Sequence, residues 1–248
     1  MRMITLPRAA VHTGPLILVN RQYPIQGQYL SSIRLTSLTP AAAMESTAAN
    51  LLLACMQALS GSQDILYVSG YRSHEEQTAL YSQSIADHGL DFTEQFVAQP
   101  GASEHETGLA MDLGLNQKEI DFIRPAFPDT GICAQFTDLA AKYGFIRRYT
   151  AKKQAQTGIA DEPWHFRYVG RPHARVMETL GLCLEEYIEL IRKYRYMGEH
   201  YLVSDGNRKA ELFFVRAGAR ETILSMPDNG FFQISGNNCD GFIVTYWR

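Results

Sequence analysis

Two short stretches of the chain decide how the sequence is interpreted: SEHETGLAMD at residues 103–112 and EPWHFR at residues 162–167. Together they contain two imidazoles, a carboxylate seven residues after the first imidazole and a glutamate three residues before the second. The apolar and aromatic residues of the second stretch favour a strand. This set of side chains suits one zinc ion and one general base.

Apolar patterns around these stretches predict an α+β fold, in which a small antiparallel sheet and helices surround a zinc cleft. The patterns predict strands at residues 16–19, 65–68 and 109–113, from residue 145, and at 164–169. They predict helices at residues 40–59, after Ser73, at 136–143, and as one long stretch from Pro172 to Ile191.

Residues 194–248 have a different sequence pattern, in which short segments rich in Val, Ile, Phe and Tyr are separated by turns that contain Gly and Asn. We therefore expect a catalytic domain over residues 1–193 and a β-rich C-terminal extension over residues 194–248. A packing or dimer-forming module is the favoured interpretation of the extension, ahead of a cell-wall binding module.

The composition excludes several classes of partner. The chain has 248 residues, 46% of them hydrophobic, and a net charge of -3. This length is enough for a sizeable core. The net negative charge gives no basic surface that would favour binding to nucleic acid or to anionic lipid. The sequence shows no signal peptide, no membrane anchor and no paired cysteine motif, so it predicts a cytoplasmic protein with reduced thiols.

A catalytic zinc site takes three protein ligands and leaves one position open for water. His105, Asp112 and His165 can provide these ligands, and the distant third one would close the site only in the folded domain. Taken alone, each histidine is more often structural than a ligand, and Asp112 could be a turn residue. Their presence in two compact motifs favours one zinc ion per chain.

Further residues suit a hydrolytic pocket. Glu162 is separated from His165 by Pro163 and Trp164, so its carboxylate can lie beside the metal and act as general base. Arg72 lies where a strand meets the start of a helix, and its fixed positive charge suits a developing oxyanion. Gln77, five residues later, could add an amide to the pocket.

The glutamates on either side of His105 are not preferred as the base. Glu104 and Glu106 would both point away from His105 if the segment is extended. Each metal-binding histidine is also expected to need a partner for its outer ring nitrogen, which the sequence does not name.

Over roughly residues 14–190 the chain resembles the zinc D-Ala-D-Ala carboxypeptidases and dipeptidases of the VanY, VanX and VanXY type. The resemblance lies in motifs that occur in order: SGYRS at residues 69–73 with Gln77, S-x-H-x-x-G-x-A-x-D at 103–112, TGI at 157–159, and EPWHFRYVG at 162–170.

The resemblance implies a role for each site residue. It implies that zinc is held by His105, Asp112 and His165. It implies that Glu162 is the catalytic base and that Arg72 stabilises the transition state. It also implies that Gln77 and Ser103 help to hold the terminal carboxylate of the substrate.

The activity that the resemblance implies is hydrolysis of the terminal D-Ala-D-Ala amide, in the free dipeptide, in the peptidoglycan pentapeptide precursor, or in both. The chain looks most like the soluble bifunctional VanXY members, which would remove the targets of vancomycin-type antibiotics. One alternative is an L,D-carboxypeptidase of the same fold in peptidoglycan turnover. Another is a non-catalytic, zinc-stabilised binding module, against which the presence of Glu162 and Arg72 argues.

Overall fold

A computed structural model describes residues 1–26 and 33–248, which form two compact units. One unit is Val19–Cys183, and the other combines Met1–Leu18 with Leu184–Arg248. This division differs from the expected boundary at residue 193. The N-terminal segment joins the second unit because β1 (Arg2–Pro7) forms an antiparallel pair with β10 (Glu221–Met226), and this unit also begins earlier than expected, at Leu184.

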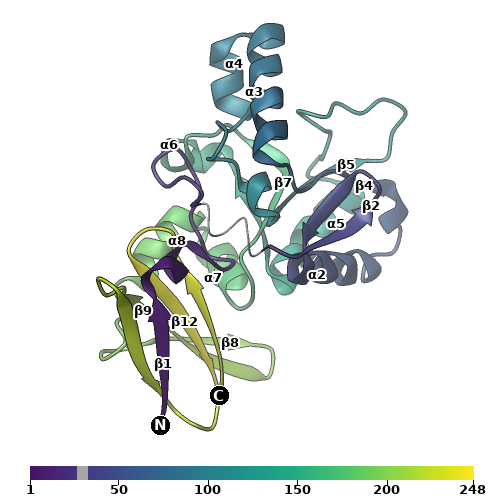
Figure 1. The fold of residues 1–248 in the computed structure, drawn as a ribbon. Coiled ribbons are helices and arrows are strands. Elements are labelled where there is room, and N and C mark those ends of the chain that lie inside the picture. The colour runs from purple at the N-terminus through teal and green to yellow at the C-terminus, as the bar shows by residue number, and fades with distance from the viewer. Residues whose placement is uncertain (27–32) are drawn as a thin grey trace. The chain divides into compact units, whose positions relative to one another are not determined.

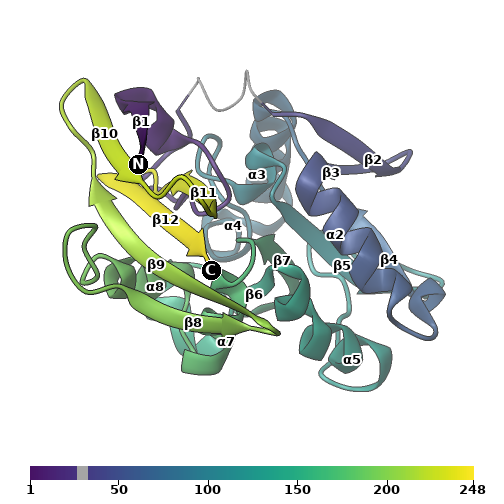
Figure 2. The same ribbon diagram turned by 90° about the horizontal axis from the view of Figure 1, so that it is seen from below.

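The sheet of the unit Val19–Cys183 is four-stranded and antiparallel, in the order β4-β5-β7-β6 (Figures 1 and 2). Its strands are β4 (Ile65–Ser69), β5 (Ala110–Leu115), β7 (Glu162–Tyr168) and β6 (Phe145–Tyr149). All four were predicted from the sequence. β7 begins earlier than expected, at Glu162, so this glutamate and His165 lie on the same strand.

Helices and a hairpin complete this unit. The helices are α2 (Ser46–Gln57), α3 (His74–His88), α4 (Leu90–Phe96), α5 (Gly131–Ala140), α6 (Gln154–Thr157) and α7 (His173–Leu180). Short 3-10 segments are η2 (Ser62–Asp64), η3 (Glu104–Thr107), η4 (Ala141–Tyr143) and η5 (Ala151–Lys153), and the hairpin is β2 (Leu35–Thr39) with β3 (Ala42–Glu45).

Local sequence explains how these helices are placed. Ser73 and Glu76 form a reciprocal capping box that starts α3, as the sequence predicted for Ser73. α3 and α4 lie side by side (Figure 1). α5 packs on the sheet through Phe136, whose ring meets Phe166 of β7 edge to face at 4.8 Å.

Three predicted elements differ in the structure. The segment 16–19 is buried but is not a strand, because Leu16 N–H bonds the Ser235 hydroxyl and Leu18 N–H bonds the Asn237 carbonyl. The start of the helix predicted at 40–59 is instead β3. The long helix predicted from Pro172 ends at Gly181, whose left-handed φ of 62° stops α7.

The second unit is β-rich, as predicted for its C-terminal part. Its four-stranded antiparallel sheet has the order β11-β12-β9-β8, with β11 (Phe231–Gly236), β12 (Gly241–Trp247), β9 (Arg208–Arg216) and β8 (Tyr201–Asp205) (Figure 2). The unit also contains η1 (Arg8–His12), the β1-β10 pair and α8 (Leu184–Ile191). Its apolar core consists of Val11, Phe213, Val215, Leu224, Met226, Phe242 and Val244.

Across the described residues, the structure contains no helix with the length and apolar character that a membrane span requires.

Candidate metal centre and catalytic pocket

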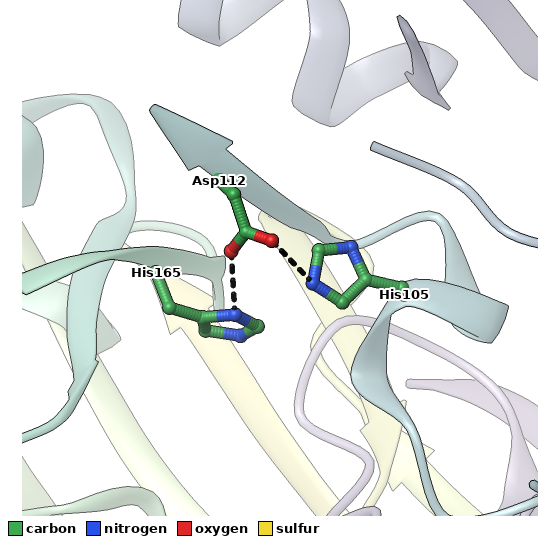
Figure 3. A group of neighbouring side chains, drawn as sticks. All are labelled: His105, Asp112 and His165. Atoms are coloured by element: carbon green, nitrogen blue, oxygen red, sulfur yellow. Dashed lines mark hydrogen bonds and ion pairs between the residues drawn. The ribbon is translucent and has the colours of Figure 1, made fainter. Parts of the chain in front are cut away.

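The three predicted metal ligands meet at one end of the β5-β7 ladder. Asp112 of β5 lies directly opposite His165 of β7, and His105 lies on η3, just before β5. Figure 3 shows the Asp112 carboxylate between the two rings, with Oδ1 2.9 Å from Nδ1 of His165 and Oδ2 3.1 Å from Nε2 of His105. The donor atoms of all three residues lie within 4.8 Å of one another.

A backbone contact fixes the orientation of the His105 ring. Its Nδ1 lies 2.7 Å from the carbonyl oxygen of Gly70. A carbonyl only accepts hydrogen bonds, so Nδ1 carries the hydrogen and Nε2 presents its lone pair toward Asp112. Gly70 is required at this close approach, because a Cβ there would lie 2.2 Å from the Ala43 carbonyl oxygen.

The protonation tendencies of the three residues fit a divalent cation. Burial and the nearby Arg72 lower the pKa of His105, which favours the neutral ring. Burial alone would raise the pKa of Asp112, but the contacts with His105 and His165 together outweigh it and keep the pKa well below its usual range. Burial would lower the pKa of His165, yet its contacts with Asp112 and Glu104 raise it to about 9. The position of His165 therefore attracts positive charge, from a proton or from a metal ion.

Glu162 reaches the same pocket because the β6-β7 ladder is irregular. Arg147 pairs with Phe166 and Tyr149 pairs with Glu162, so β7 bulges between its paired residues. The bulge lets the Glu162 carboxylate approach His165, with Oε2 3.7 Å from Nδ1. Burial raises the pKa of Glu162 to about 8, and Asp112 adds to this effect. Such a carboxyl group suits proton transfer near neutral pH.

Arg72 enters the pocket from the loop between β4 and α3. Its Nη1 donates a 2.8 Å hydrogen bond to Oε1 of Gln77, and its Nη2 lies 3.8 Å from Oδ2 of Asp112. Its Nε has no hydrogen-bond partner among the described residues. Burial lowers the pKa of the guanidinium, while Asp112 and Glu162 favour its charged form. A fixed cation therefore lies beside the three predicted ligands.

The two residues predicted to bind substrate lie in the same pocket but differ in their bonds. Gln77 is buried with both ends of its amide engaged, since its Nε2 donates to the Ala98 carbonyl at 2.7 Å and its Oε1 accepts from Arg72. Ser103 is buried at the start of η3, and its side chain makes no cap hydrogen bond there. The pocket is lined by these two residues, by the three predicted ligands, and by Arg72, Leu80, Phe96, Val97, Ala98, Glu104, Phe122, Ile123, Tyr149, Ile159, Glu162 and Trp164.

Glu104 was expected to point away from His105 in an extended segment, and that premise was wrong. The segment is 3-10 helical rather than extended, and Oε2 of Glu104 lies 3.5 Å from Nε2 of His165. Its Oε1 contacts Arg148 Nε at 2.8 Å and Arg167 Nη1 at 2.9 Å. Burial alone would raise the pKa of Glu104, but Arg167 and Arg148 outweigh it and hold the pKa far below its usual range.

Glu106 contacts neighbouring segments rather than the three predicted ligands, although the segment is not extended. Its carboxylate accepts the Gly101 N–H at 2.7 Å and lies 2.9 Å from His74 Nδ1. The sequence signal that could have separated the two glutamates is Gly108, whose left-handed φ of 69° ends the helical turn.

Comparison with known proteins agrees with this geometry. The model of the VanY family, described as D-alanyl-D-alanine carboxypeptidase, matches residues 41–171, which is more than half of the chain. A bifunctional D-Ala-D-Ala dipeptidase and carboxypeptidase of Enterococcus gallinarum, VanXYC, is 49% identical over 126 residues. That alignment covers 50% of this chain and 66% of the relative.

Solved structures extend the likeness over the whole chain. The vancomycin resistance D,D-dipeptidase VanXYg, in complex with a D-Ala-D-Ala phosphinate analog, superposes with a TM-score of 0.95 at 45% identity and covers 100% of this chain and 99% of its own. The LD-carboxypeptidase LdcB superposes with a TM-score of 0.58 at 34% identity and covers 69% of this chain and 84% of its own. The chain thus belongs to the VanY family of D-alanyl-D-alanine carboxypeptidases.

Proposed function

We propose that this chain hydrolyses the terminal amide of D-Ala-D-Ala with the help of one zinc ion. The observation that carries the proposal is the arrangement of His105, Asp112 and His165, whose donor atoms lie within 4.8 Å of one another. Glu162 and Arg72 line the same pocket as these three residues. Two imidazoles and one carboxylate form a donor set typical of catalytic zinc, and the two further groups suit proton transfer and charge stabilisation.

Each residue has a defined task in this reaction. Zinc held by His105, Asp112 and His165 would supply Lewis-acid chemistry for amide hydrolysis. Glu162 takes a proton from the attacking water and passes it to the leaving amine. Arg72 stabilises the negative charge that develops on the carbonyl oxygen. These charges act strongly on one another because the pocket is buried and its effective dielectric constant is low.

Ser103 and Gln77 would act at the carboxyl end of the substrate. The buried Ser103 hydroxyl can donate to a carboxylate in this pocket. Gln77 has both ends of its amide bonded within the protein, to Arg72 and to Ala98, which gives it a second task of orienting Arg72. Its expected contact with the substrate stays a prediction.

The cavities support a substrate range that includes a longer peptide. The catalytic pocket is small and partly open, with a volume of about 50 Å³. An adjoining cavity of about 280 Å³ shares Val97, Ala98, Tyr149 and Ile159 with it. We assign the terminal D-Ala-D-Ala unit to the first cavity and the preceding residues of a pentapeptide precursor to the second.

The physiological role proposed is removal of precursors that end in D-Ala-D-Ala, the targets of vancomycin-type antibiotics. It is supported by the likeness to VanXYC and to VanXYg. Action in the cytoplasm stays a prediction that cell fractionation would test.

The direct test measures release of D-Ala from the free dipeptide and from a pentapeptide ending in D-Ala-D-Ala, side by side. A tetrapeptide with an L,D-terminal bond is the third substrate. We expect hydrolysis of the dipeptide and the pentapeptide, abolished by a chelator and restored by zinc. Hydrolysis of the tetrapeptide alone would assign the chain to the L,D-carboxypeptidases, and no hydrolysis of any substrate by zinc-loaded protein would favour a binding module.

A further inference from the structure

The carboxylate of Glu104 is buried beside the predicted metal centre and held on one side by two arginines. Only 2% of Glu104 is exposed, and Arg148 and Arg167 are as deeply buried. Both arginines contact Oε1, at 2.8 Å and 2.9 Å. Arg148 donates a hydrogen bond from Nε to Oε1, and Arg167 Nη1 forms an ion pair with the same oxygen, so the two arginines hold this side of the carboxylate and limit its rotation.

The other oxygen of Glu104 faces a predicted metal ligand. Oε2 lies 3.5 Å from Nε2 of His165, at the outer limit of hydrogen-bond distance. Neither atom has a hydrogen-bond partner in the described parts of the chain. Two buried polar atoms that face each other and lack other partners are expected to pair.

This contact decides which ring nitrogen of His165 is free to bind a metal. A neutral imidazole has one N–H and one lone pair, and a carboxylate accepts only the N–H. With Nε2–H directed at Glu104, the lone pair is on Nδ1, which lies 2.9 Å from Asp112 and 3.7 Å from Glu162. His105 has the opposite arrangement, since its Nδ1 bonds the Gly70 carbonyl and its Nε2 faces Asp112.

We propose that Glu104 is a positioning residue that accepts a hydrogen bond from Nε2–H of His165 and thereby presents Nδ1 of that ring to the metal. The inference rests on the metal site of the proposed function. Because Glu104 and His105 are adjacent in the chain, the single turn η3 provides one ligand and orients another that comes from β7. Such outer carboxylates typically raise metal affinity 10- to 100-fold.

The variant Glu104→Gln tests this task with little change of shape. A glutamine has one acceptor oxygen, which the two arginines require, so its NH₂ group would face His165. Nε2 of His165 would then have to accept a hydrogen bond, which favours the tautomer of His165 with the hydrogen on Nδ1. We expect zinc affinity, measured by competition with a chelator, to fall about 10- to 100-fold.

Glu106→Gln is the matched control. Glu106 is equally buried, and its partners are the Gly101 N–H and His74 rather than a predicted ligand. We expect this variant to keep the zinc affinity of the wild type. Wild-type affinity in folded Glu104→Gln, or an equal loss in the control, would overturn the proposal.

A spectroscopic measurement on the wild type keeps the inference testable if Glu104→Gln does not fold. In protein loaded with ¹¹³Cd and labelled with ¹⁵N in histidine, we expect cadmium coupling to Nε2 of His105 and to Nδ1 of His165. Coupling to Nε2 of His165 would overturn the proposal. If Glu104→Gln folds and binds zinc more weakly but keeps the wild-type coupling pattern, the proposal is also overturned, because Glu104 would then stabilise the site without selecting the ring nitrogen. Failure of the wild type to bind cadmium or zinc would instead contradict the proposed function.

Discussion

The two units of this chain both contain a four-stranded antiparallel sheet, but they bury different chemistry beside it. In the unit Val19–Cys183, buried carboxylates, imidazoles and guanidinium groups meet at the β5-β7 ladder. In the β-rich unit, the sheet packs on an apolar core that includes Phe213 and Phe242. A buried polar residue there, Asn237, bonds the backbone N–H groups of Asp240 and Gly241 in a turn.

This difference between the two units indicates which of them contains the functional site. Burial of several charged groups opposes folding unless they are paired, and replacing them with apolar side chains is often neutral or stabilising. The β-rich unit folds its sheet on an apolar core and buries fewer charged side chains, among them Asp205 and Glu211. The charges retained around His165 therefore point to chemistry rather than to stability.

The largest effect is expected from a change of Glu162. Glu162→Gln keeps the shape of the side chain but removes its capacity to accept a proton. We expect kcat for D-Ala-D-Ala hydrolysis to fall about 1,000-fold, while zinc content stays at the wild-type level. Steady-state kinetics together with metal analysis measure both quantities. Unchanged hydrolysis would remove Glu162 from the mechanism.

A change in the apolar core of the β-rich unit should lower stability and leave the metal site unchanged. Phe213 is 2% exposed and stacks on His200, with ring centroids 4.2 Å apart. We expect Phe213→Ala to lower the free energy of unfolding by about 3–5 kcal/mol and to leave the zinc affinity of the folded protein unchanged. Urea denaturation and chelator competition test the two parts. Loss of zinc affinity in this variant would break the distinction between the two units.

Gln77→Ala separates two tasks of one residue. If Gln77 mainly orients Arg72 through their 2.8 Å hydrogen bond, kcat should fall about 10-fold with KM nearly unchanged. If it mainly holds the substrate carboxylate, KM should rise instead. Gln95→Ala is the control, because Gln95 is exposed and its side chain bonds the Asp91 carbonyl. A rise of KM alone would assign Gln77 to substrate binding.

The smallest effect concerns the pH dependence of stability in the unit Val19–Cys183. Burial lowers the pKa of His173 to about 3 from 6.5. Between these values the unfolded chain binds a proton that the folded chain does not, so the free energy of unfolding decreases as the pH falls below 6.5. His173→Gln should flatten this dependence by up to about 1.4 kcal/mol per pH unit.

Urea denaturation between pH 5 and 8 in excess zinc measures the slope. The exposed His88, changed to Gln, is the control and should keep the slope of the wild type. An identical slope in His173→Gln would show that His173 does not contribute to the pH dependence.

Local sequence patterns predicted most elements around the site, because capping signals and apolar periodicity act over a few residues. They predicted β4, β5, β6, β7 and the start of α3. They could not predict the pairing of β1 with β10, since the two strands are separated by most of the chain and strand pairing depends on tertiary context.

The site was predictable as a set of residues but not as a geometry. The motifs identified residues that the structure brings into one pocket. The approach of Glu162 to His165 depends on a bulge in β7, and the contact of Glu104 with His165 depends on a helical turn where an extended segment was expected. The bulge is a consequence of long-range strand register, which residue spacing does not encode, whereas the turn is local and Gly108 is its sequence signal.

Restoring zinc to metal-free protein tests the central claim most directly. Protein stripped with a chelator is titrated with zinc while D-Ala release from D-Ala-D-Ala is followed, and His165→Ala is titrated in parallel. We predict that activity is absent without metal, rises in proportion to added zinc and saturates at one zinc per chain. We also predict that His165→Ala neither binds zinc tightly nor regains activity. Full activity of the metal-free wild type, or normal zinc binding and activity in His165→Ala, would contradict the account.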